Sequence, residues 1–287
     1  MRSKLHSNIH TFIGCDTAFD DAELVIFGAP FDSTTSFRPG TRFAADYIRM
    51  DSFGLETYSP YMDKDLADYQ LTDIGNLDLP FGNAAKALEV IEETAAEILE
   101  AGKVPFLIGG EHLVSLGTIR AAYKKYPNMK LLHFDAHTDL RDHYMGESLS
   151  HAAVIRRSWD FMGDGTIFQF CIRSGEKWEF EWAKTHTHLE KFSYDTLQSV
   201  VEKLGTEDPI YITIDLDVFD PSIFSGTGTP EPGGIFFKDM IEILKTMAPL
   251  NIIGADVVEL SPHYDQTGVS TATACKVIRE LMLTMLK

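Results

Sequence analysis

The sequence predicts an α/β fold built on a mainly parallel sheet that helices cover on both faces. Apolar runs of strand length alternate with helix-like segments about eight times along the 287 residues. No repeat period, low-complexity tract or linker divides this alternation. Although the length could accommodate two domains, we therefore expect residues 1–287 to form a single domain around one large buried sheet.

Seven segments are predicted as strands. The first is a short apolar run ended by Gly28 and Pro30, and the loop after it, 32–41, is rich in Ser, Thr and Gly. Such loops at strand ends are where α/β proteins keep their sites. The predicted strands are 24–30, 71–75, 104–108, 131–134, 167–172, 209–214 and 251–258.

Helices are predicted between these strands. The clearest spans 84–101, where Leu88, Ile91 and Ala95 fall at spacings of three and four and Gly102 stops the pattern. Ser193 is the predicted N-cap of a helix over 193–204. The other predicted helices start at about 43 or span 113–126, 151–161, 178–184, 236–247 and 269–286.

Composition limits the classes of partner. Residues are 44% hydrophobic and 24% charged, as in ordinary soluble proteins, and the formal net charge of -18 argues against nucleic acid and favours metals, amines or guanidinium groups. Three distant cysteines, Cys15, Cys171 and Cys275, indicate structural thiols in a reducing compartment. Residues 1–20 lack the apolar core of a signal peptide, and no run has membrane-spanning length. We expect a cytoplasmic protein.

Residues typical of metal ligands stand at the predicted strand ends. Asp135, His137 and Asp139 alternate and would share one face if the chain stayed extended. Asp215 and Asp217 repeat this spacing after 209–214, and His112 follows 104–108. Because ligands bind at the carboxyl ends of strands in such sheets, we expect these six side chains to converge.

Four clustered carboxylates would repel one another strongly unless cations offset their charge. Two divalent ions would do so, and the two imidazoles would complete an oxygen-rich site that suits Mn²⁺, with Zn²⁺, Fe²⁺ and Ni²⁺ as weaker choices. Such a pair would lower the pKa of a bridging water and supply hydroxide at neutral pH. Taken singly, His112 could instead start a helix and Asp215 could cap a turn; their combination favours metals. Five histidines without a motif are expected on the surface or in packing: His6, His10, His186, His188 and His263.

Six motifs resemble the ureohydrolase family of arginase and agmatinase, with the greater similarity to bacterial agmatinases. They are Gly-Gly-Glu-His (109–112), Phe-Asp-Ala-His-Thr-Asp (134–139), Ser-His-Ala (150–152), Ile-Asp-Leu-Asp-Val-Phe-Asp-Pro (214–221), Gly-Thr-Gly-Thr-Pro-Glu-Pro-Gly-Gly (226–234) and Val-Val-Glu-Leu-Ser-Pro (257–262). The resemblance implies a three-layer α/β/α sandwich around an eight-stranded parallel sheet, one ureohydrolase catalytic domain over 1–287, and a homo-oligomer, often a trimer or hexamer.

The resemblance also implies roles for single residues. One Mn²⁺ would be held by His112, Asp135, Asp139 and Asp215, and the other by His137, Asp135, Asp215 and Asp217. A shared hydroxide, hydrogen-bonded to Asp139, would attack the guanidinium carbon and release urea and an amine. His151 would carry protons, titrating near neutrality, and Glu259 would pair with the guanidinium. Without the resemblance, His151 could simply start a helix and Glu259 could be a surface charge.

Agmatine, cleaved to putrescine and urea for polyamine biosynthesis, is the expected substrate. The Glu-Pro-Gly-Gly ending at 231–234 resembles agmatinases, and the Asn-His-Gly pattern of arginases is absent. His263 departs from the agmatinase pattern. The alternatives are an enzyme for a guanidino- or formimino-acid (guanidinobutyrase, arginase or formimidoylglutamase), whose carboxylate could meet Arg156, Arg157 or Arg173, and a metal-binding protein without turnover. Loops 32–41 and 141–150 are expected to surround the far end of the substrate.

Overall fold

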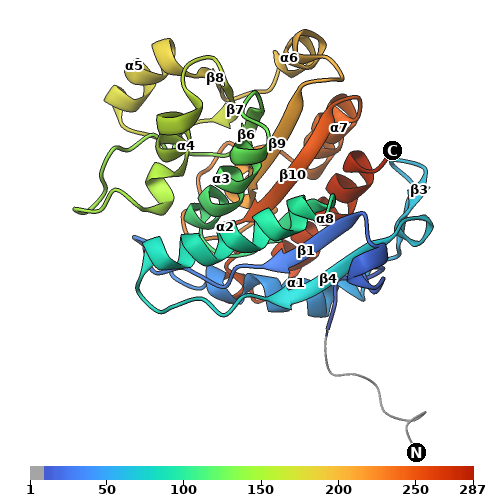
Figure 1. The fold of residues 1–287 in the computed structure, drawn as a ribbon. Helices are drawn as coiled ribbons and strands as arrows, with labels where there is room; N and C mark the ends of the chain where they lie inside the picture. The colour runs from blue at the N-terminus through green and yellow to red at the C-terminus, as the bar shows by residue number, and fades with distance from the viewer. Residues whose placement is uncertain (1–9) are drawn as a thin grey trace, which may run out of the picture.

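The computed structural model describes residues 10–287 and shows three layers, a central sheet with helices on both faces (Figure 1). The sheet has eight strands in the order β4-β1-β5-β10-β9-β6-β7-β8, and every neighbouring pair is parallel. This confirms the predicted architecture. The strands are β1 (Leu24–Gly28), β4 (Leu71–Asn76), β5 (Val104–Ile108), β6 (Lys130–Phe134), β7 (Ile167–Ile172), β8 (His188–Lys191), β9 (Pro209–Asp215) and β10 (Asn251–Val258), and a small antiparallel pair is β2 (Tyr58–Ser59) with β3 (Lys64–Asp65).

Alternation along the strands divides the core in two. Leu24 and Ile26 of β1 pack in one apolar cluster with α1, α6, α7 and α8, whereas Val25 and Phe27 pack in the other with α2, α3 and α4. Both faces of each central strand are therefore covered, as the apolar runs predict. The helices are α1 (Ala44–Ser52), α2 (Ala84–Glu100), α3 (Ser115–Lys125), α4 (Val154–Met162), α5 (Lys177–His186), α6 (Leu197–Leu204), α7 (Phe237–Met247) and α8 (Val269–Met285).

Two elements on one side of the sheet differ from the prediction. Strand β8 was not predicted because it is an edge strand whose side chains are exposed or half-buried, so its sequence carries no apolar run. Helix α6 begins at Leu197, so Ser193 is not its N-cap. The Ser193 hydroxyl instead donates to Glu190, whose carboxylate also accepts from the Thr196 N–H just ahead of the helix.

The chain turns as soon as β6 ends at Phe134, so the predicted extended spacing of the following residues is wrong. The His137 N–H donates back to Asp135 Oδ1 at 2.5 Å, and Asp139 has a left-handed backbone with φ 51°. The same turn follows β9, where the Asp217 N–H donates to Asp215 Oδ1 at 2.8 Å. Each turn commits one carboxylate oxygen to the backbone and directs the other toward His112.

The cysteines, and the described histidines that were expected on the surface or in packing, lie outside the cavity at the predicted metal ligands. Cys15, Cys171 and Cys275 are buried and unbridged, as predicted. His186 and His188 stack on aromatic rings, His263 packs against Phe43, and His10 is exposed. His6 lies outside the described residues. Over 10–287, no helix combines the length and apolar character needed to cross a membrane.

Gly110 follows β5 and lies very close to the backbone at Ala29, just after β1, so we expect Gly110→Ala to destabilise the fold. Gly110 has φ +83°, and an added Cβ would lie 2.4 Å from the Ala29 carbonyl oxygen. Gly102 has a similar φ of +77° with nothing within 4 Å of its Cβ position, so Gly102→Ala isolates the backbone strain. Denaturant unfolding should show a loss of about 1–2 kcal/mol for Gly102→Ala and roughly 2–4 kcal/mol for Gly110→Ala. Equal losses would contradict the steric argument.

Candidate active site

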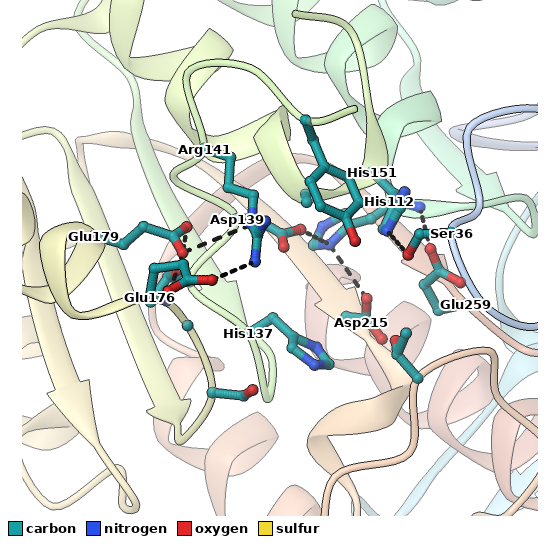
Figure 2. A pocket seen from close by; sticks show the side chains of 16 residues that line it. Ser36, His112, His137, Asp139, Arg141, His151, Glu176, Glu179, Asp215 and Glu259 are labelled. Carbon is teal, nitrogen blue, oxygen red and sulfur yellow. Dashed lines mark hydrogen bonds and ion pairs between the residues drawn. The ribbon is translucent and has the colours of Figure 1, made fainter. Parts of the chain in front are cut away.

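A cavity of about 340 Å³ opens at the carboxyl ends of the central strands (Figure 2). Four adjacent strands, in the order β5, β10, β9 and β6, end beside it. Since parallel strands all end at one edge, residues far apart in sequence meet there. Its lining includes residues of both predicted substrate loops, Ser36 from 32–41 and Arg141 and Tyr144 from 141–150.

His112 faces three carboxylates. Its Nδ1 lies 3.1 Å from Asp135 Oδ2, 3.0 Å from Asp139 Oδ2 and 3.3 Å from Asp215 Oδ2. Figure 2 shows the imidazole directed at Asp139 and Asp215. This buried nitrogen makes no hydrogen bond of good geometry, although three carboxylate oxygens lie near it.

A buried relay fixes the orientation of His112. Its Nε2 lies 2.9 Å from Thr213 Oγ1, and the Thr213 hydroxyl donates to Asp256 Oδ1 at 2.6 Å. Because that hydroxyl has already given its proton to Asp256, it accepts from His112 Nε2–H. When the imidazole is neutral, its Nδ1 lone pair is left to face the carboxylates, which is the arrangement a metal-binding histidine needs.

A second group lies next to the first and shares Asp135 with it. His137 Nδ1 lies 2.9 Å from Asp217 Oδ2 and 3.5 Å from Asp135 Oδ1. Asp217 is held by the Ala136 N–H and the Thr229 hydroxyl. The structure therefore brings together all six predicted ligands, with Asp135 between the two groups.

Burial makes the charge of this cluster costly. Burial and the neighbouring Asp135 carboxylate raise the pKa of Asp139 to about 7, and burial followed by repulsion from Asp217 and Asp135 raises the pKa of Asp215 well above its usual range. Burial alone would lower the pKa of His112, but the surrounding carboxylates raise it well above its usual range. Each group thus tends to hold a proton that offsets the negative charge.

The donor set fits divalent cations. Over residues 10–287, only histidines lie within ion-pair distance of Asp135, Asp139, Asp215 and Asp217, so no Lys or Arg neutralises them. Buried carboxylates without a partner are strongly unfavourable. Ligand atoms about 2.1 Å from an octahedral ion lie about 3 Å apart, as the atoms around His112 do. Carboxylates with imidazoles therefore form a credible metal centre here.

Glu259 follows β10 and lies beside His112. It is 5% exposed, and its Oε1 accepts the His112 N–H at 2.7 Å, so the interpretation as a surface charge is wrong. Burial, followed by repulsion from Glu111 and Asp217, raises the pKa of Glu259 well above its usual range. Its backbone has φ 65°, a conformation rare outside glycine. Strain of this kind is retained where the surrounding structure needs a side chain in one place.

His151 reaches the cavity from the start of a short 3₁₀ helix, His151–Ala153. Its N–H donates to Thr34 Oγ1 at 3.0 Å, and its Nε2 lies 3.3 Å from Ser36 Oγ. The Thr34 hydroxyl in turn donates to the buried Glu111 carboxylate at 2.7 Å. The expectation that His151 titrates near neutrality is wrong, because burial, aided by His137 and His112, lowers its pKa to about 4.

The arginines considered for a carboxylate tail do not line the cavity. Arg173 donates to backbone carbonyls, including Asp217 O at 2.7 Å and Glu231 O at 2.8 Å. Arg156 and Arg157 lie on α4 and pair with Asp160. Arg141 does line the cavity, and Figure 2 shows it turned toward Glu176 and Glu179, from which its nitrogens lie 3.5 and 3.8 Å.

Comparison with known proteins agrees with this geometry. The sequence model of the arginase family matches residues 22–284. The agmatinase of Bacillus subtilis (strain 168) is 47% identical over 280 residues, which cover 96% of each chain. The chain belongs to the arginase family.

Solved structures of the arginase family superpose closely. The crystal structure of a putative agmatinase from Clostridium difficile has a TM-score of 0.91 and 49% identity, covering 93% of this chain and 98% of that one. The agmatine ureohydrolase of Thermoplasma volcanium has a TM-score of 0.89 and 30% identity, covering 99% of this chain and 96% of its own. Family, fold and enzyme class, a hydrolase of linear amidines, are thereby confirmed.

Sequence reasoning missed several residues that surround the site. Two carried a readable signal: His133 extends the alternation of the three ligands after it, and Asp256 is a lone charge inside the apolar run 251–258. Glu111, Thr213 and Arg141 carried none, because their roles depend on neighbours from distant segments.

The lowered pKa of His151 predicts a pH effect on the metal-free protein. The unfolded chain takes up a proton at His151 below its usual pKa near 6.5, whereas the folded chain does so only near 4. The free energy of unfolding should therefore fall as the pH falls through this window. With chelator present, wild type should lose on the order of 2 kcal/mol more than His151→Gln between these two pH values. Parallel stability curves would show that burial does not depress the pKa.

Proposed function

We propose that this chain is a manganese-dependent hydrolase that cleaves the guanidino group of agmatine to putrescine and urea, for polyamine biosynthesis. The whole chain, 1–287, would form one catalytic domain that acts in the cytoplasm as a homo-oligomer, a trimer or hexamer. One observation carries the proposal. A single cavity holds a cluster of side chains suited to divalent metals, the buried Glu259 and further acidic side chains. The high identity to proteins named agmatinase supports the substrate.

Two Mn²⁺ per subunit would be held by the six ligands. His112, Asp135, Asp139 and Asp215 would hold one, and His137, Asp135, Asp215 and Asp217 the other. The pair, when bound, would supply a hydroxide at neutral pH by lowering the pKa of water. The turns at Asp135 and Asp215 support this assignment, because each fixes one oxygen and directs the other at His112.

Glu259 would bind and orient the guanidinium. Its Oε1 is held by the His112 N–H, and within 10–287 its Oε2 makes no hydrogen bond. A planar guanidinium presents N–H groups that match a carboxylate, and fixing it holds the carbon in line for attack. The hydrogen bond from the His112 N–H would hold the Glu259 side chain in place while it binds the guanidinium.

Asp139 and His151 would handle protons. Asp139 would accept a hydrogen bond from the attacking oxygen, which keeps its lone pair aimed at the guanidinium carbon. His151 lies in the wall of the same cavity, next to Ser36 and Thr34. Its lowered pKa leaves the imidazole uncharged at neutral pH, so it would first accept a proton and then pass that proton to the departing amine.

The outer wall favours a cationic tail. Apart from Asp139, Asp215 and Glu259, which are assigned to the metals and the guanidinium, the cavity is lined by two carboxylates, Glu176 and Glu179, against one guanidinium, Arg141. Arg141 already faces Glu176 and Glu179 and lies over the Tyr144 ring at 4.3 Å. An ammonium end is therefore better matched than a carboxylate end. One feature favours a guanidino- or formimino-acid instead: the 3.5 Å contact between Arg141 and Glu176 is weak and open to solvent.

A substrate panel tests the proposal. After loading with Mn²⁺ and determination of bound metal, urea or formamide release should be measured with agmatine, arginine, 4-guanidinobutyrate and formiminoglutamate. We expect kcat/KM to be highest for agmatine, because its ammonium end suits the acidic wall. A preference for one of the acids would reject the substrate while leaving the hydrolase chemistry intact.

Variants of the proton-handling residues test the assignment of roles. Asp139→Asn and His151→Ala should each lower kcat with agmatine roughly 10²- to 10⁴-fold. His188→Ala, an exposed histidine on the edge strand β8, is the matched control and should keep its turnover. Unchanged kcat in either site variant would overturn the role given to that residue.

A further inference from the structure

His133 is a buried histidine next to the proposed metal ligands, and it has no role in the proposed reaction. It lies on β6 with no exposed surface, and its Nε2 is 2.7 Å from Asp135 Oδ2. Its position next to His112, with ring centroids 5.2 Å apart, would allow it to be taken for a further ligand. Its hydrogen-bond partners decide whether His133 is itself a ligand or supports a neighbouring ligand.

Gln169 on β7 fixes which nitrogen of His133 carries the proton. The Gln169 Nε2 lies 2.8 Å from the Thr138 carbonyl oxygen, which can only accept, so the amide orientation is set by chemistry. Its Oε1 accepts from the Thr187 hydroxyl at 3.0 Å, which agrees with that orientation. The second hydrogen on Nε2 then points at His133 Nδ1, 3.1 Å away.

This contact makes His133 Nδ1 an acceptor. The proton of the neutral ring must then be on Nε2, where it is donated to Asp135 Oδ2. Neither ring nitrogen has a free lone pair, so His133 in this arrangement is not a metal ligand. Using Nε2 for a metal would move the ring proton to Nδ1, where it would meet the Gln169 N–H, so Gln169 would have to turn and give up its bond to Thr138.

We propose that His133 is a positioning residue, held in its Nε2–H tautomer by Gln169 and Thr187, that orients the carboxylate Asp135 toward both metal groups. The proposal rests on the metal assignment made above. Asp135 is the residue shared by the two groups, and its oxygens have different partners: Oδ1 accepts the His137 N–H, and Oδ2 lies between His133 and His112. A carboxylate held at both oxygens cannot rotate about its Cβ–Cγ bond. Without the hydrogen bond from His133, Asp135 would no longer be fixed in the orientation that both ions use.

Removing the hydrogen bond should weaken metal binding. His133→Phe keeps a buried ring without the donor, and we expect a 10- to 100-fold increase in the Kd for Mn²⁺, as is typical when a partner of a ligand is lost. His133→Gln should recover most of the affinity, because its oxygen can accept from Gln169 while its NH₂ donates to Asp135. Leu132→Val is the control for altered packing. Leu132 is the neighbouring residue on the same strand and packs in the apolar cluster on the other face of the sheet. Calorimetric titration with Mn²⁺ measures all four proteins.

The tautomer can be measured directly and without metal. Selective ¹⁵N labelling of histidine, with His133→Gln to assign its signals, should show one proton, on Nε2, and a coupling from Nδ1 to Gln169 Nε2–H. The Mn²⁺ EPR spectrum of His133→Phe, recorded with both sites filled, should differ from that of wild type, whereas a purely structural role would leave it unchanged.

A proton on Nδ1, or a Kd in His133→Phe equal to those of wild type and Leu132→Val, would overturn the proposal. Should His133→Phe fail to fold, a tenfold or greater loss in His133→Gln would overturn it as well, since that variant keeps the donor. These outcomes are separate from the proposed activity: a wild type that binds Mn²⁺ but does not cleave agmatine would reject the substrate and leave the role of His133 standing.

Discussion

Four buried aspartates share one small region at the carboxyl edge of the sheet, and much of the surrounding structure serves to keep their charge in place. Their oxygens lie 2.9–3.3 Å from the imidazole nitrogens of His112 and His137, and within residues 10–287 no Lys or Arg contacts them. Such a cluster is unfavourable by itself. It persists because the sheet, with apolar clusters on both faces, supplies the stability that the site does not.

Four of the six proposed ligands, Asp135, Asp215, Asp217 and His112, are held by a hydrogen bond to a group that is not itself a ligand atom. Backbone N–H groups in tight turns hold Asp135 and Asp215, and neutral donors or acceptors such as Thr213 hold the imidazole of His112. None of these partners brings a compensating positive charge. The protein therefore orients the carboxylates without neutralising them, which preserves their attraction for a cation.

The strands, helices and ligand types were predictable because each has a local cause. Apolar runs and helical spacing predict seven of the eight strands of the central sheet and the eight α-helices, and the ligand types are visible because acids and histidines follow apolar runs. The reason given for their convergence was wrong: β6 ends before Asp135, and turns, not an extended face, bring the ligands together. Strand β8 was missed because an edge strand needs no apolar run. Asp256 stands out as a lone charge in an apolar run, but the side chains that it and Gln169 contact could not be predicted, because those contacts depend on strand order, which local sequence does not specify.

The candidate metal centre and the proposed substrate site are joined at one residue. The imidazole of His112 faces the aspartates, while its backbone N–H holds Glu259, so one short segment after Gly110 positions both a proposed ligand and the proposed partner of the guanidinium. The backbone strain at Glu259 is sustained by this contact and by its own N–H, which donates to the Gly110 carbonyl at 3.0 Å. A shift of His112 on losing a cation would therefore be passed to Glu259 through a single peptide group. On this geometry, an ion would assist the reaction twice: by its own chemistry, and by fixing the residue that holds the substrate against it.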